Sequence, residues 1–277
     1  MSQPSSRVPR PRPAKKKAAR KRAAKSTKRA TRKKTAKKKP VRKKSAKRAR
    51  RKKSAAAAGP DPATRKRARR ILTVLHRLYA DADCALHHRS AFQLVIATIL
   101  SAQSTDVNVN KVTPTLFDRY PDPGDLAAAD PEAVEEIIRS TGFFRQKRKS
   151  IQGASQKIVD DFGGEVPNTM EGLTSLPGVA RKTANVVLGT WFGQNEGVVV
   201  DTHVGRIAWR LGLTWRSRDT KDAVKIEQDL TEVLPREDWT FFSHAVIWHG
   251  RQICRARKPR CEECDLSGDC PSAFSPS

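Results

Sequence analysis

The 277 residues carry a formal net charge of +28, and nearly all of that charge lies at one end of the chain. Of the 56 lysines and arginines, 27 lie at or before Lys53, where there is no Asp or Glu, so the rest of the chain has 29 basic and 28 acidic side chains. The chain is therefore a nearly neutral body with a polycationic arm. No apolar run approaches the roughly 20 residues of a membrane-spanning helix, which argues against a membrane protein.

The arm, residues 1–60, is rich in Lys, Arg and Ala, and apart from Met1 its only larger apolar residues are Val8 and Val41. Such a segment cannot bury a core, so we predict that it is disordered. Nucleic acid is the expected partner, because each neutralised phosphate releases condensed counterions. An anionic membrane is disfavoured because the arm has no aromatic side chain to insert. A solubility tail and a transit peptide are the remaining alternatives.

The body, from about residue 64, shows helical periodicity almost throughout, and we predict an all-α fold. Ser90 and Asp106 are expected to cap helices, Asp130-Pro131 to open one, and Gly163-Gly164 to end one. The apolar run 198–200 is suited to a short strand, but it has no other strand to pair with. In chain order, the predicted helices cover 64–80, 90–100, 106–120, 131–141, 147–162, a segment ending at 192, 201–211, 219–234 and 236–252.

Four cysteines close the chain in the spacing C-x6-C-x2-C-x5-C: Cys254, Cys261, Cys264 and Cys270. Four thiolates this close in sequence can surround one tetrahedral metal ion or one iron–sulfur cluster. Two disulfides are disfavoured, because the lysine-rich N-terminus has no secretory apolar segment, and we expect a reducing intracellular compartment. The spacing alone does not rank zinc against a 4Fe–4S cluster. The distant Cys84 is expected to be a buried thiol.

The segment 176–184, LPGVARKTA, fits a helix–hairpin–helix turn. Pro177 cannot continue a helix, and Gly178 tolerates a conformation closed to other residues. The free amides at the start of the next helix can then hold a phosphate. A purely structural connector is the alternative, but the polycationic arm favours a contact with the DNA backbone.

Four collinear motifs and the cysteine pattern resemble the endonuclease III family, bifunctional DNA glycosylases with an iron–sulfur cluster. The motifs are SAQSTDVNVNK at 101–111, GFFRQK at 142–147, LPGVARKTANVVLG and VDTHVGRIAWR. The resemblance covers about residue 66 to Pro271 and leaves the arm outside. It implies a two-lobed helix–hairpin–helix glycosylase fold, with a six-helix barrel at 84–194 and a cluster domain formed by 64–83 plus 195–277. It also implies a 4Fe–4S cluster on the four cysteines, and a monomer that acts on duplex DNA with oxidised pyrimidines.

The same resemblance makes Lys182 the nucleophile that attacks the sugar, forms a Schiff base and cuts the strand 3′ to the lesion by β-elimination. An amine is needed because only an amine gives an iminium electron sink. The amine must also be unprotonated, and partial burial beside Arg181 would favour this by disfavouring the charged form. Asp201 matches the family's catalytic aspartate, which takes a proton and stabilises positive charge at the sugar. An Asp at the start of a helix is also a common N-cap, and the two roles are compatible.

Further residues are expected to contact DNA. By family position Gln103 fills the gap that a flipped-out nucleotide leaves, and Phe143 is either an apolar wedge or a core aromatic. Ala180 stands where the hairpin usually has a second glycine, so a Cβ there is expected to loosen the contact with a phosphate. His203 matches a family histidine to which the sequence assigns no role, and packing is one alternative. The other expected contacts are Gly178 and Arg181 in the hairpin, and Arg255, Arg257, Lys258 and Arg260 between the first two cysteines.

Two other functions share features with this sequence. An adenine mismatch glycosylase shares the fold and the cluster, but that family generally lacks the hairpin lysine and has a further C-terminal domain, whereas this chain has Lys182 and only seven residues after Cys270. A non-catalytic DNA-compacting protein would not need to retain both Lys182 and Asp201. We therefore expect a repair enzyme of the cytoplasm, associated with the bacterial nucleoid, or of the nucleus if the host is a eukaryote.

Overall fold

A computed structural model describes residues 59–217 and 219–275, and every regular element within these ranges is a helix. The prediction of an all-α fold is therefore confirmed. The predicted arm lies almost wholly outside the described residues. Among the helices of the described ranges, none is long and apolar enough to cross a membrane.

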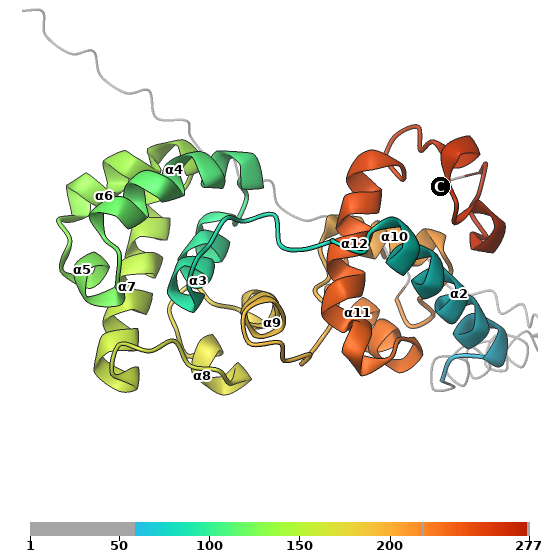
Figure 1. The fold of residues 1–277 in the computed structure, drawn as a ribbon, viewed down its shortest axis with the longest axis horizontal. Coiled ribbons are helices and arrows are strands. Elements are labelled where there is room, and N and C mark those ends of the chain that lie inside the picture. The colour runs from blue at the N-terminus through green and yellow to red at the C-terminus, as the bar shows by residue number, and fades with distance from the viewer. Residues whose placement is uncertain (1–58, 218, 276–277) are drawn as a thin grey trace, which may run out of the picture. The chain divides into compact units, whose positions relative to one another are not determined.

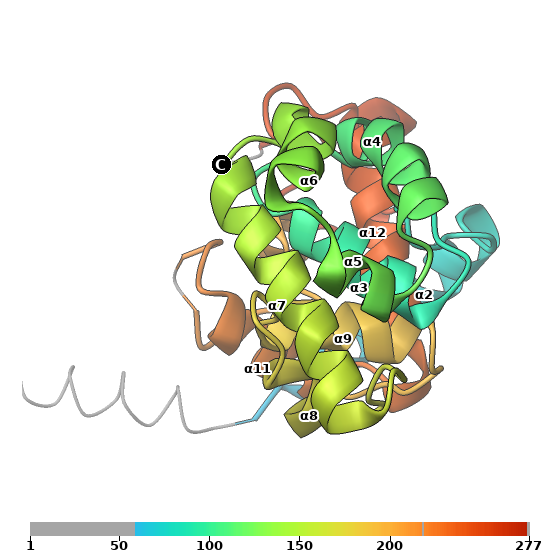
Figure 2. The same ribbon diagram turned by 90° about the vertical axis from the view of Figure 1, so that its left-hand side faces the viewer.

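The first of two hydrophobic cores draws its buried residues from Leu86 to Leu188. At its centre lies the short helix that follows Ser90, in which seven of ten residues are buried. Figures 1 and 2 show this helix, α3, lying between α7 and α9. The helices of this core are α3 (Ala91–Leu100), α4 (Asp106–Arg119), α5 (Pro123–Ala128), α6 (Pro131–Ile138), α7 (Phe144–Phe162), α8 (Met170–Thr174) and α9 (Arg181–Thr190), with the 3-10 turn η1 (Arg139–Thr141) between α6 and α7.

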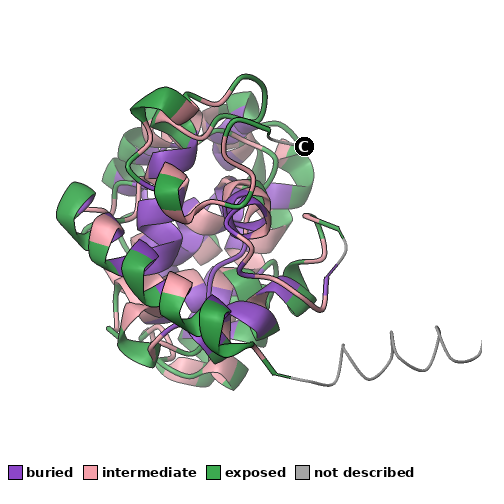
Figure 3. Cartoon of the chain, turned by 90° about the vertical axis from the view of Figure 1, so that its right-hand side faces the viewer, coloured by how far each residue is buried: buried purple, intermediate pink, exposed green. Residues whose placement is uncertain are grey.

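The second core joins the first described helix to the C-terminal part of the chain. The helix α2 precedes the first core in sequence but packs against α11 and α12. In Figure 3 the buried residues of this half gather on the inner sides of its helices. Its elements are α2 (Pro62–Leu78), α10 (Thr202–Arg210), α11 (Ala223–Val233), η2 (Arg236–Asp238), α12 (Trp239–Gln252), η3 (Cys261–Glu263) and η4 (Ser267–Asp269). The predicted division into 84–194 and 64–83 plus 195–277 remains a prediction, and these two cores are its packing basis.

Several predicted boundaries were wrong, and capping explains most of them. Thr105, not Asp106, is the N-cap of α4: the Thr105 hydroxyl accepts a hydrogen bond from the Asn108 amide at 3.2 Å. The short helix α5, which begins at Pro123, is not among the predicted helices. A proline is well suited to the first helical position, and Asp122 caps the helix from the residue before it. The helix α7 begins at residue 144 rather than 147, and α8 was missed because it is a single short turn.

The suggested strand at 198–200 does not form. The three valines Val198, Val199 and Val200 are 1%, 4% and 7% exposed, and the segment has no neighbouring strand among the described residues. Instead, the Val199 amide donates to the Ser243 hydroxyl of α12 at 3.0 Å. The apolar run therefore marks burial in the second core rather than sheet pairing.

Candidate active site and metal centre

A cavity of about 330 Å³ is lined by residues from the helices of both cores. It contains three of the residues that the sequence singled out, Gln103, Lys182 and Asp201. These residues are far apart in sequence and come from the α3–α4 connection, the first turn of α9 and the start of α10. The fold therefore brings together the predicted nucleophile, the predicted acid–base residue and one predicted DNA contact.

Lys182 is exposed, so the partial burial that would favour an unprotonated amine is not found. The expected neighbour also points elsewhere: the Arg181 guanidinium donates to Glu227 Oε1 at 3.1 Å and to the Glu196 carbonyl at 3.4 Å. The two successive side chains diverge because adjacent helical positions face different directions. The Lys182 amine is consequently free to reach a ligand that enters from solvent.

The turn before α9 needs glycine at one position only. Gly178 has φ +81, and a Cβ on it would lie 2.7 Å from the Ser150 Cβ of α7. Ala180 has φ −92 in the extended region, which any residue adopts, so its Cβ imposes no backbone strain. As N-cap of α9, Ala180 offers no side-chain acceptor, and the first amides of this helix are left for another partner.

Asp201 is the N-cap of α10, as one of the two interpretations predicted. Its Oδ1 atom accepts hydrogen bonds from the amides of His203 at 2.8 Å and Val204 at 2.7 Å. Within the described part of the chain, Oδ2 has no hydrogen-bond partner. One oxygen is therefore used by the helix, and Asp201 also lines the cavity.

Gln103 and Phe143 share an uncommon backbone conformation. Their φ angles are +54 and +48, in the left-handed region that non-glycine residues rarely adopt. Both side chains are exposed, and Phe143 is 67% exposed, so the interpretation of Phe143 as a core aromatic was wrong. Strained backbone of this kind is concentrated at functional sites, where the surrounding structure holds it in place.

The cavity also contains residues that the sequence analysis missed. Asp106 forms an ion pair with Arg251 of α12, and both side chains line the cavity. His244 lies deeper, and burial lowers its pKa below the usual value for histidine. Cys84 also lines the cavity, and burial raises the pKa of its thiol to about 11, as befits an unreactive buried thiol. The sequence named Asp106 only as a helix cap and Cys84 only as a thiol, because only the tertiary fold brings these residues to the cavity.

His203 does not line this cavity. Its Nδ1 atom accepts a hydrogen bond from the Arg206 guanidinium at 3.2 Å. Its ring packs so closely on Gly250 that a Cβ there would lie 2.6 Å from Nδ1. These contacts fit the packing alternative for His203.

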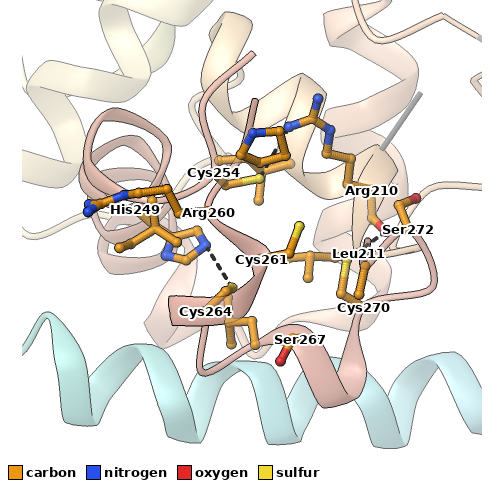
Figure 4. A pocket seen from close by; sticks show the side chains of 15 residues that line it. Arg210, Leu211, His249, Cys254, Arg260, Cys261, Cys264, Ser267, Cys270 and Ser272 are labelled. Carbon is orange, nitrogen blue, oxygen red and sulfur yellow. Dashed lines mark hydrogen bonds between the residues drawn. The ribbon is translucent and has the colours of Figure 1, made fainter. Parts of the chain in front are cut away.

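The four C-terminal cysteines line one common cavity, and their side chains surround the same space (Figure 4). Arg210 donates to Cys254 Sγ at 3.4 Å, and His249 Nε2 lies 3.7 Å from Cys264 Sγ. Burial raises the pKa of Cys264 to about 11. Within the described ranges, no three or more His, Cys, Asp or Glu side chains are grouped closely enough to hold a single metal ion.

The basic residues after Cys254 fall into two groups. Arg255, Arg257 and Lys258 are exposed, and Arg210 holds the backbone of their loop by donating to the carbonyls of residues 255 and 256 at 2.8 and 3.0 Å. Arg260 instead donates to the Gln252 carbonyl at 2.7 Å and to Glu263 at 2.8 Å. The first three are therefore free to bind an anion, while Arg260 also fixes the loop.

Comparisons with known proteins agree with the motifs. Residues 96–236 match the model of the HhH-GPD superfamily of base excision DNA repair proteins. An endonuclease III from Synechocystis is 57% identical over 203 residues, 73% of this chain and 91% of the relative. One from Bacillus subtilis is 45% identical over 195 residues, 70% and 86% of the two chains. A solved structure of a trapped covalent endonuclease III–DNA intermediate has a TM-score of 0.70 at 40% identity, covering 76% of this chain and 96% of the other.

Proposed function

This chain belongs to the endonuclease III family of the HhH-GPD superfamily, and we propose that Lys182 and Asp201 carry out its chemistry. The protein is a base excision repair enzyme, a DNA glycosylase with AP lyase activity on oxidised pyrimidines. The observation that carries the assignment of residues is that Lys182 and Asp201 line one cavity although they lie on different helices.

In the proposed reaction, the Lys182 amine attacks C1′ of the flipped-out nucleotide, and the base leaves with the electron pair of its bond to C1′ and takes up a proton from solvent. Asp201 Oδ2 accepts the proton that the amine loses and stabilises positive charge at the sugar. The sugar ring opens to a Schiff base on Lys182. Loss of a C2′ proton then expels the 3′ phosphate, because the iminium takes up the electron pair. Water finally releases Lys182.

Trapping with borohydride tests this assignment. The wild-type protein should form a covalent adduct with abasic duplex DNA, and Lys182→Ala should form none. Lys157→Ala is the matched control, because Lys157 is a lysine of α7 that pairs with Asp161. If Lys182→Ala traps as well as Lys157→Ala does, another amine is the nucleophile.

We assign the DNA contacts to three surfaces. The hairpin offers the uncapped start of α9, with Gly178, Ala180 and Arg181 around it. The cysteine loop offers Arg255, Arg257, Lys258 and Arg260, and Arg210 holds the start of this loop through the carbonyls of residues 255 and 256. Gln103 would fill the vacated position in the duplex, and the exposed Phe143 would unstack the neighbouring step. Solved relatives include complexes with DNA, which supports DNA as the partner.

For the cofactor, we propose a 4Fe–4S cluster held by Cys254, Cys261, Cys264 and Cys270. Four thiols around a shared space can hold such a cluster, and the endonuclease III family to which the chain belongs favours it over a zinc ion. When bound, the cluster gives the cysteine loop four fixed attachment points. Iron and acid-labile sulfide in equal amounts, with both lost in Cys261→Ser, are the expected result, and bound zinc would contradict it.

We further propose a monomer, located in the cytoplasm at the nucleoid, whose arm raises the local concentration of DNA. Deleting residues 1–53 should weaken non-specific binding and flatten its dependence on salt. Single-turnover cleavage at saturating enzyme should be unchanged. A large loss in that step would show instead that the arm takes part in the active site.

A further inference from the structure

Lys147 is a buried lysine that no part of the proposed reaction uses. It lies in the first turn of α7 and is 5% exposed. Its Nζ atom donates to the carbonyls of Leu100 and Thr141, both at 2.8 Å. Burying an ammonium group is costly unless it is hydrogen-bonded, so these two carbonyls account for its position.

The two carbonyls stand at the starts of two loops. Leu100 is the last residue of α3, and Thr141 is the last residue of η1. The carbonyls at the C-terminal end of a helix lack helical partners and carry partial negative charge, which an ammonium group matches well. The Gln103 loop (residues 101–105) follows the first carbonyl, and the Phe143 loop (residues 142–143) follows the second.

Each loop presents one exposed residue with positive φ, Gln103 at +54 and Phe143 at +48. Because one Nζ atom binds both carbonyl oxygens, the starts of the two loops are held within two hydrogen-bond lengths of each other. A second link runs from α4, where Asn108 Nδ2 donates to the Ser140 carbonyl at 2.9 Å and to the Ser104 hydroxyl at 3.2 Å. The two loops are therefore joined by two separate side chains.

We propose that Lys147 is a positioning residue that fixes the Gln103 loop and the Phe143 loop relative to each other, so that both enter the same step of the duplex. The inference rests on the DNA contacts proposed for Gln103 and Phe143. Filling the vacated position and unstacking its neighbour must occur together, and two loops fixed in advance lose less freedom on binding than two independent ones.

The chain offers a matched control on the same helix. Gln152 also bridges two backbone carbonyls, with Nε2 donating to Ala129 at 2.8 Å and to Leu126 at 3.4 Å, but these lie at α5, away from both loops. Lys147→Met and Gln152→Met each remove a double carbonyl link and keep an unbranched side chain. A merely structural role for Lys147 predicts that the two variants behave alike.

The test measures base excision from a lesion duplex and, separately, cleavage of a single-stranded abasic site, which has no stack to fill. Lys147→Met should lose on the order of 10²-fold in kcat/KM on the duplex, mainly through KM, and stay within about twofold of wild type on the single strand. A 2-aminopurine beside the lesion should fluoresce less than with wild type, because it stays stacked. Gln152→Met should match wild type in all three measurements.

Equal behaviour of the two methionine variants overturns the proposal. If Lys147→Met does not fold, Asn108→Ala replaces it, because this change removes the second link between the loops. Asn108→Ala should show the same duplex-specific loss of activity in smaller degree. Activity of Asn108→Ala equal to wild type on the duplex would then overturn the proposal. Failure of the proposed function is distinguishable, because the wild-type protein would then give no borohydride adduct. A wild-type adduct with no duplex-specific loss in either variant rejects the positioning role alone.

Discussion

Two helices begin at the same cavity, and their N-termini are built in opposite ways. The helix α10 starts behind Asp201, whose carboxylate binds two amides of the first turn. The helix α9 starts behind Ala180, which has no capping side chain, and continues with the cations Arg181 and Lys182. Basic residues and a missing cap at an N-terminus both oppose helix stability. The unfavourable end is the one to which the nucleophile and the phosphate contact are assigned, so stability is given up there for a ligand.

The largest effect is expected at the capped end, where Asp201→Asn and Asp201→Ala separate the two roles of one side chain. The asparagine keeps an oxygen for the two amides but cannot accept the proton, so excision should fall about 10²- to 10⁴-fold with little change in stability. The alanine should lose the same activity and also about 1 kcal/mol of stability. Single-turnover assays measure the excision rate of each variant, and denaturant melts measure its stability. Wild-type rates in Asp201→Asn would reduce Asp201 to a helix cap.

At the uncapped end, Gly178→Ala tests whether the turn depends on a left-handed residue. An alanine at φ +81 is strained, and its Cβ would lie 2.7 Å from Ser150. The expected loss is about 1–3 kcal/mol of unfolding free energy, with weaker DNA binding because the hairpin shifts. Gly163→Ala, at φ +62 with no atom near its Cβ, is the control for strain without a clash. A larger loss in Gly163→Ala would show that the contact with Ser150 is unimportant.

Ala180→Asp gives α9 a capping aspartate like the one that begins α10. The extended backbone of residue 180 suits a cap, so the free energy of unfolding should increase by about 1 kcal/mol. The melting temperature should rise accordingly. The added carboxylate would occupy the amides meant for a phosphate and repel it, so DNA binding should weaken about tenfold. Ala180→Ser adds a cap without charge and should stabilise with a smaller loss of binding. If Ala180→Asp binds DNA as tightly as wild type, the start of α9 is not a phosphate site.

The smallest effect is expected from Arg181→Ala. Its guanidinium group already pairs with Glu227, and an exposed ion pair of this kind contributes about 0–1 kcal/mol. We expect the slope of log K against log salt to fall by less than about one unit, the value for one full phosphate contact. Titrations of DNA binding at several salt concentrations measure this slope. A full unit would mean that Arg181 leaves Glu227 for a phosphate in the complex.

Much of the fold could be predicted because its signals are local. Ser90, Asp130 and Asp201 do cap helices, and Gly163 ends α7 at φ +62. The errors arose where burial decided the outcome. Val198 and Val200 are buried in the second core without a strand to pair with, and Phe143 is 67% exposed although it is aromatic. Neither outcome could be predicted from the neighbouring residues in the sequence.

The sequence by itself determined the all-α class and most of the longer helices, the cysteine spacing, the hairpin and the family to which the chain belongs, since these depend on residue type and order along the chain. Only the tertiary structure decided that Lys182 is exposed, that Asp106 pairs with Arg251 beside it, and that Lys147 holds two loops. Those facts depend on distances between segments far apart in sequence, and such distances are set by how the two cores pack.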